Sequence, residues 1–127
     1  MTKKLFQNKL IVKKSSLHNS GYGVFAGKTI RKKELIEECY VVISRGGDKV
    51  LQDFYFDAKK GKSALFLGFG SIYNHSEEPN ADYTINKRKR IATIKAKRTI
   101  RKGEEIFLYY GYQWFSSRKW KPKKAKK

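Results

Sequence analysis

Cysteine, histidine and proline are scarce in this 127-residue sequence, which has one cysteine, two histidines and two prolines. A single cysteine, Cys39, excludes a disulfide within the chain and the multi-cysteine sites that hold structural zinc. The two histidines, His18 and His75, are too few for a histidine-rich metal site. We therefore expect no metal site.

Long apolar runs are also missing. None reaches the roughly 18 residues that a membrane-spanning helix needs, and residues 1–7 lack the apolar centre of a secretory signal. We expect a soluble intracellular protein that makes no membrane contact. The length is that of one domain, long enough to bury a core without disulfides or metals. An enzyme of this size has to build its cofactor site and its substrate site from one core.

Acidic residues are few, because 11 Asp and Glu stand against 30 Lys and Arg, for a net charge of +19. Many cations form blocks, at residues 87–90, at 95–102 and in the tail 118–127. Such blocks favour attraction to nucleic acid or another polyanion. A solvated basic surface is the alternative. The carboxylates Glu34, Glu37 and Glu38 either pair with surface cations or line a groove that attracts a basic peptide.

Helical periodicity is weak as well. Short apolar segments separated by glycine-rich turns favour a mostly β fold, made of several short-stranded sheets with little helix. Residues 83–94 predict a hairpin around a basic loop at 86–90. The other predicted strands are residues 9–14, 35–44, 53–56 and 105–110. We expect an N-terminal extension at 1–8, one domain at 9–116 and a basic flexible tail at 117–127.

One stretch of sequence is repeated. Residues 26–36 (AGKTIRKKELI) resemble residues 96–106 (AKRTIRKGEEI). Both predict a strand, an exposed basic turn and a second strand. Ile30 and Ile100 occupy matching places in the two copies, and we expect them to be apolar plugs beneath the turns.

Three further segments carry polar and aromatic groups suited to a site. They are GYG at residues 21–23, NHSEEPN at 74–80 and GEEIFLYYG at 103–111. The glycines allow positive φ and close backbone approach to a ligand, and Asn and His side chains make directional hydrogen bonds. Taken singly, the three segments read as a hairpin turn, a polar surface loop and a core strand with a tyrosine at its wet end.

In this order and at this spacing, the three segments resemble the SET-domain family of protein lysine methyltransferases. The resemblance covers residues 10–115, and the compact length looks most like the minimal viral SET proteins. It implies transfer of a methyl group from S-adenosylmethionine to a lysine amine, with cofactor and peptide entering a narrow channel from opposite faces. No metal takes part in such a displacement, and positioning supplies much of the acceleration.

The resemblance also implies roles for single residues. Tyr110 would be the catalytic residue, at the point where the two pockets meet. The other residues implied at the cofactor are Tyr22, Gly23, Asn74, His75, Trp114 and Phe115, the last two packing on the adenine. The implied walls of the substrate channel are Tyr22, Phe54, Tyr55 and Leu108. Leu108 lacks the hydroxyl with which a tyrosine at this place restricts the product to one methyl, so we expect di- or trimethylation.

The substrate implied is a histone tail or another basic protein, which predicts action in the nucleus (a host nucleus for a viral protein). The basic tail would then contact DNA or the nucleosome without reading sequence. The likeness to compact viral members also suggests a homodimer. One alternative is a catalytically degenerate SET module that acts as a basic DNA- or chromatin-associated binding protein. A second is a small nucleic-acid-binding β domain with coincidental motifs, which would need exposed aromatic residues for stacking.

Overall fold

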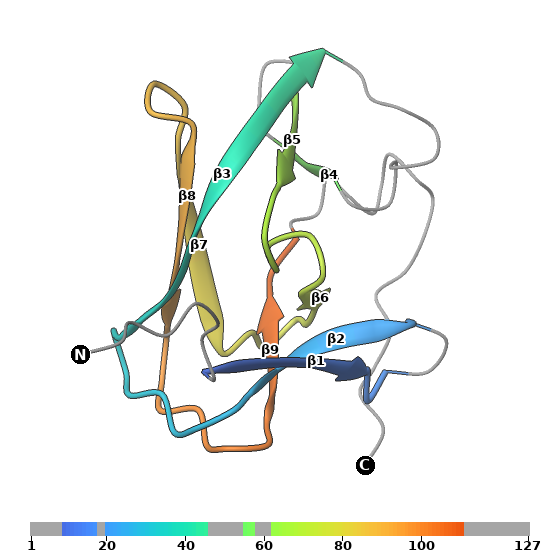
Figure 1. Ribbon diagram of the computed structural model, residues 1–127, viewed down its shortest axis with the longest axis vertical. Helices are drawn as coiled ribbons and strands as arrows, with labels where there is room; N and C mark the ends of the chain where they lie inside the picture. The colour runs from blue at the N-terminus through green and yellow to red at the C-terminus, as the bar shows by residue number, and fades with distance from the viewer. Residues whose placement is uncertain (1–8, 18–19, 46–54, 58–61, 111–127) are drawn as a thin grey trace, which may run out of the picture.

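The computed structural model describes residues 9–17, 20–45, 55–57 and 62–110, and in these residues it is built from strands alone (Figure 1). The strands are β1 (Leu10–Lys14), β2 (Tyr22–Ala26), β3 (Leu35–Arg45), β4 (Tyr55–Asp57), β5 (Lys62–Phe66), β6 (Asn74–His75), β7 (Ala81–Asn86), β8 (Ile91–Ala96) and β9 (Glu105–Leu108). The predicted mostly β fold is confirmed. Nothing in the described part of the chain is a helix long and apolar enough to cross a membrane. The predicted extension at 1–8 and tail at 117–127 lie outside the described residues.

The larger sheet has five strands in the order β4-β5-β3-β8-β7, all antiparallel. Its centre is the long β3, which the sequence predicts almost to its ends. The basic loop at 87–90 closes the β7–β8 hairpin, as expected. In β8 the buried residues Ala92, Ile94 and Ala96 alternate with more exposed ones, because successive side chains of a strand point to opposite faces. This face supplies much of the core.

The smaller sheet has four strands in the order β1-β2-β9-β6. Its strand β9 pairs with β2 in the antiparallel sense and with the two-residue β6 in the parallel sense. Asn74 lies opposite Phe107, and His75 opposite Leu108. The second and third motif segments are therefore neighbours, although each pair of facing residues is 33 positions apart in the sequence.

Asn80 ties the loop after β6 to the same strand. Its side chain is almost fully buried, at 2% exposure. Its Nδ2 donates to the carbonyl of Glu105, and its Oδ1 accepts from the amide of Phe107, both at 2.8 Å. One amide side chain thus satisfies a donor and an acceptor on the backbone of β9, as a neighbouring strand would.

The repeated stretch forms two turns that face each other across a local twofold axis. Ile30 and Ile100 exchange backbone hydrogen bonds at 2.8 and 2.7 Å, and both are fully buried. The bond from the amide of Ala26 to the carbonyl of Glu104 is repeated by the bond from Ala96 to Glu34. The expectation that both isoleucines plug the core beneath basic turns is confirmed.

The two turns differ at one position. Lys33 has φ 71°, and Gly103, its counterpart, has φ 92°. Positive φ costs about 1 kcal/mol or more for a residue with a side chain, and almost nothing for glycine. A Cβ at Gly103 would have no heavy atom within 4 Å, so the penalty of adding one there lies in the backbone alone.

We expect Gly103→Ala to lower the free energy of unfolding by about 1 kcal/mol, measured by denaturant titration. Lys33→Gly should leave it nearly unchanged, because relief of the positive φ offsets the greater freedom of glycine in the unfolded chain. Lys32→Gly is the matched control and should cost about 0.5–1 kcal/mol. Equal losses for Lys33→Gly and Lys32→Gly would contradict this account.

Candidate active site

Two hydrogen bonds fix Tyr110, which lies just after β9: one at its backbone amide and one at its hydroxyl. Its backbone amide donates to His75 Nδ1 at 2.8 Å, and its hydroxyl donates to the backbone carbonyl of Tyr73. The amide of Ser76, the residue after His75, donates to the carbonyl of Leu108, two residues before Tyr110, at 3.0 Å. The tyrosine that follows the last strand is therefore fixed in position and direction by the NH segment.

The ring of Tyr110 packs in an aromatic cluster. It lies edge-on to Phe56 with ring centroids 5.3 Å apart, and it is also 5.3 Å from the ring of His75. Phe56 stacks on Phe66 at 4.1 Å and meets Tyr83 edge-on at 5.1 Å. These rings place apolar surface beside Tyr110, and such surface would desolvate a cation brought next to it.

Burial, together with the nearby Glu105 carboxylate, raises the pKa of Tyr110 well above its usual range. The hydroxyl therefore stays protonated at neutral pH and acts as a hydrogen-bond donor. A tyrosinate that takes a proton from the substrate would need the opposite shift in pKa. The environment of Tyr110 favours a role in orienting the reacting groups.

His75 is nearly buried, at 5% exposure. Burial lowers the pKa of His75, and Glu77, whose Oε1 lies 3.6 Å from Nε2, partly offsets this effect. Because Nδ1 accepts the amide of Tyr110, the neutral imidazole carries its hydrogen on Nε2. The chemical task of His75 in the described structure is to hold the backbone of Tyr110.

A buried carboxylate, Glu105 at the start of β9, connects the three motif segments. It is 6% exposed. It accepts hydrogen bonds from the Ser15 hydroxyl at 2.8 and 3.1 Å, from the amide and hydroxyl of Ser16 at 2.8 and 2.6 Å, and from Asn74 Nδ2 at 3.0 Å. Burying a charge is costly without such partners, so these donors and Glu105 require one another.

Glu105 also explains the second glycine of the GYG segment. A Cβ at Gly23 would lie 2.2 Å from Glu105 Oε2 and 3.0 Å from Asn74 Nδ2. Any larger residue would push the carboxylate away from its donors. The same Asn74 nitrogen donates to the backbone carbonyl of Tyr22 at 3.1 Å, which joins the GYG segment to β6. Gly21 has φ 68° and open space beside it.

Several hydrogen-bond acceptors lie close together at this site. Among the described residues none donates to Asn74 Oδ1, and the carbonyls of Tyr22 and Tyr73 and the Glu105 carboxylate lie close by in the structure. An acceptor-rich site fits S-adenosylmethionine, which carries a sulfonium and an ammonium group. Within the described ranges no group of three or more His, Cys, Asp or Glu side chains could hold a metal ion.

A second carboxylate, Glu37 of β3, supports the site from behind. The hydroxyl of the fully buried Tyr73 donates to Glu37 Oε1 at 2.6 Å, and the amide of Phe69 donates to Oε2 at 3.0 Å. Burial raises the pKa of the Cys39 thiol to about 12, and Glu37 adds to this shift. By accepting the hydrogen bond from the Tyr73 hydroxyl, Glu37 fixes Tyr73, whose backbone carbonyl accepts the hydrogen bond from Tyr110.

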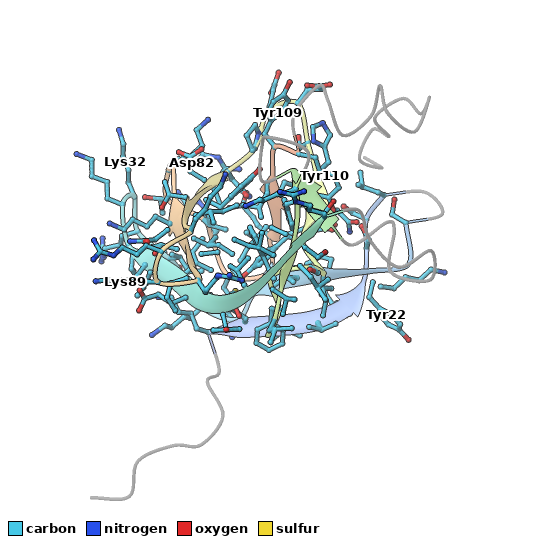
Figure 2. The ribbon with its side chains drawn as sticks, turned by 90° about the horizontal axis from the view of Figure 1, so that it is seen from above. Tyr22, Lys32, Asp82, Lys89, Tyr109 and Tyr110 are labelled. Atoms are coloured by element: carbon cyan, nitrogen blue, oxygen red, sulfur yellow. The ribbon has the colours of Figure 1, made fainter. Side chains whose placement is uncertain are left out.

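The remaining predicted residues lie in several places. Tyr22 brings its backbone to the network, but its side chain is 67% exposed and points outward, away from Tyr110 (Figure 2). Leu108 is fully buried at the end of β9, so it can form only an inner wall. Tyr55 lies in β4, opposite Leu65. Phe54, Trp114 and Phe115 lie outside the described residues.

Sequence reasoning missed four residues that the structure brings to the site. They are Phe56, Tyr73, Glu37 and the carboxylate of Glu105. Period-two alternation along the predicted strand 53–56 offered a signal for Phe56, because it predicts one face for Phe56 and Phe54. The acidic group at 34–38 offered one for Glu37, which turns out to accept hydrogen bonds from Tyr73 and Phe69.

Comparisons with known proteins identify the family to which this fold belongs. A family model for the SET domain matches residues 21–111. A histone-lysine N-methyltransferase of Schizosaccharomyces pombe, specific for H3 lysine-37, is 31% identical over 103 residues, which is 75% of this chain and 70% of that protein.

Solved structures with a similar fold are also SET-domain proteins or contain one. A Plasmodium falciparum protein described as a histone methyltransferase has a TM-score of 0.71 and 35% identity, over 87% of this chain and 99% of that one. The Chaetomium thermophilum Polycomb Repressive Complex 2, in a structure bound to S-adenosylmethionine, shows the same fold with a TM-score of 0.64 and 22% identity, over 82% of this chain and 15% of that one. The chain belongs to the SET-domain family of lysine methyltransferases that use S-adenosylmethionine.

Proposed function

We propose that this protein methylates a lysine of a histone tail, and that it carries the product to the di- or trimethyl state. The observation that carries the proposal is the double hold on Tyr110, by His75 at its amide and by the Tyr73 carbonyl at its hydroxyl. The names of its relatives in Schizosaccharomyces pombe and Plasmodium falciparum support a histone as the substrate.

When bound, S-adenosylmethionine supplies an activated methyl group on a sulfonium. Gly23, Asn74 and the backbone of Tyr22 would hold it, on the acceptor-rich side of the site. The Tyr73 carbonyl and the Tyr110 hydroxyl form a polar pair among aromatic rings. Such a pair can orient an amine that enters between the rings, and positioning of this kind supplies a large part of the acceleration.

The target amine has to lose its proton before it can attack, since a free lysine has a pKa of about 10.4. The apolar surface of Phe56, Tyr83 and Tyr110 disfavours the ammonium form by desolvation. Tyr110 remains protonated, because burial raises its pKa. The departing proton therefore goes to solvent before the transfer rather than to Tyr110.

Three further statements rest on sequence resemblance and belong to the proposal. They are kinship with minimal viral members, a homodimer and action in the nucleus; the last is supported by the histone substrates in the names of the relatives. The basic tail at 118–127 would contact nucleosomal DNA. A catalytically degenerate module would instead bind the cofactor and chromatin without turnover.

Tyr110→Phe should lower transfer of labelled methyl groups to core histones by about 100-fold or more, because it removes the hydroxyl and its bond to Tyr73. Tyr109→Phe is the matched control, since Tyr109 is 43% exposed, and it should keep most of the activity. Similar activities in the two variants would contradict the role of Tyr110. A wild type that binds cofactor and methylates no protein would favour the degenerate module.

Mass spectrometry of a histone peptide under excess cofactor should show the wild type passing beyond one methyl. Leu108→Tyr should shift the product toward monomethyl, because its hydroxyl occupies space next to the amine. Leu108→Phe adds similar bulk without the hydroxyl and should retain higher methylation, although both changes strain a fully buried position. A wild type that stops at one methyl would rule out this proposal.

Glu37→Gln should lower kcat about tenfold with little change in peptide KM, because a charge-assisted bond to Tyr73 becomes a weaker neutral one. Tyr73→Phe should reproduce the loss, and the double variant should be little worse than either single one. Glu38→Gln changes the exposed neighbour and serves as the control. A rise in KM alone would mean that Glu37 lines a peptide groove instead.

A further inference from the structure

The local twofold axis places two sets of cations side by side. We call residues 27–34 and 97–104 the paired basic turns; the backbone bonds between Ile30 and Ile100 hold them together. Both turns lie at the same lower corner of the fold (Figure 1). The cations that the axis relates are Lys28 and Arg98, Arg31 and Arg101, and Lys32 and Lys102, and all six are exposed. Figure 2 shows Lys32 reaching away from the fold.

The acidic residues of the turns are used internally. Glu34 accepts the amide of Arg31 at 3.0 Å and pairs with Lys9 at 2.7 Å. Glu104 accepts the amide of Arg101 at 2.5 Å and pairs with Arg98 at 3.2 Å. These carboxylates shape the turns through the backbone. No carboxylate in the described part of the chain forms an ion pair with the side chain of Arg31, Lys32, Arg101 or Lys102.

The backbone conformation of Lys33 also indicates that this basic surface has a function. In the described residues, the two non-glycine residues with positive φ are Lys33 and Arg90, and both are cations in turns. The counterpart of Lys33 is Gly103, the residue that this conformation favours. A lysine occupies one turn in a backbone conformation that favours glycine, and unusual backbone of this kind is typical of functional surfaces.

We propose that the paired basic turns dock duplex DNA through its phosphates. Two cation sets related by a twofold axis match the two antiparallel strands of a duplex, as twofold-symmetric proteins match symmetric sites. Neither turn contains an aromatic residue on which single-stranded bases could stack. The isoleucines of both turns are fully buried, so no apolar group is offered to a membrane surface.

This surface lies away from the reacting residues. The second basic turn leads into β9, and Tyr110 follows the other end of that strand, so DNA on the turns leaves the Tyr110 end open (Figure 1). Phosphate contacts give affinity without sequence readout. The inference depends on the fold and the charges alone. It holds whether or not a histone is the substrate.

The test measures the affinity of the protein, residues 1–127, for a random-sequence DNA duplex of about 20 base pairs at several salt concentrations. The paired-turn variant combines R31Q, K32Q, R101Q and K102Q. Its control, with the same net charge, combines K14Q, K62Q, K87Q and K89Q, which change exposed lysines elsewhere. Thermal melting of both variants establishes that each is folded, independently of any enzyme activity.

We expect the paired-turn variant to bind duplex DNA at least 10-fold more weakly, and its slope of log affinity against log salt to fall by about 3 to 4. The control should lose less than half as much on both measures. Equal losses in the two variants would overturn the proposal, because they would mean that affinity follows net charge. A loss confined to single-stranded RNA of the same length would overturn it in favour of an RNA site. Methylation of a short free peptide, measured separately, should be the same in the paired-turn variant and the wild type.

Discussion

The buried carboxylate of Glu105 is the interaction on which the rest of the site depends. It lies at the start of β9, and its donors come from the segment after β1 and from β6. A single negative charge, taken out of water, thus fixes three pieces of chain that are distant in sequence. Because each donor would be left unsatisfied without it, the carboxylate and its partners form one cooperative unit. The glycine at position 23 is part of the same unit, since it supplies the empty volume that the carboxylate fills.

Most of the residues described at the site position other residues. Tyr110 is the residue that we propose contacts the reacting groups. His75 holds its backbone, Tyr73 receives its hydroxyl, and Glu37 fixes Tyr73 from the opposite side. Asn80 contributes no group to the reaction, yet it bonds the strand that leads to Tyr110 on both sides of Ile106. The described residues form a rigid site in this way, because motif residues also serve as connectors between its strands.

Much of the fold was predictable because its signals are local. Alternation and turn chemistry located β3, the β7–β8 hairpin and the last strand, and the repeated stretch predicted the plugs Ile30 and Ile100. The motifs pointed to the neighbourhood of Tyr110, Asn74 and His75 by resemblance. The tasks of Glu105 and Glu37 could not be read in advance, because each depends on partners more than 30 residues away. In β3 an irregularity between Leu35 and Glu37 also shifts the strand register, so simple alternation misjudges which side chains face inward.

The parallel pairing of β6 with β9 has a consequence for the order of folding. Asn74 and His75 alone are too few to stabilise a strand pair, and their partners Phe107 and Leu108 follow them by 33 residues in the sequence. Contacts of such long sequence separation form slowly, since the intervening chain has to be ordered first. All five strands of the larger sheet lie before residue 97, so this sheet can be complete while the segment around Tyr110 is still unplaced. During synthesis, the ribosome has to release β9 before His75 and Tyr110 can meet, so the surroundings of Tyr110 form only after all strands of the five-stranded sheet have been made.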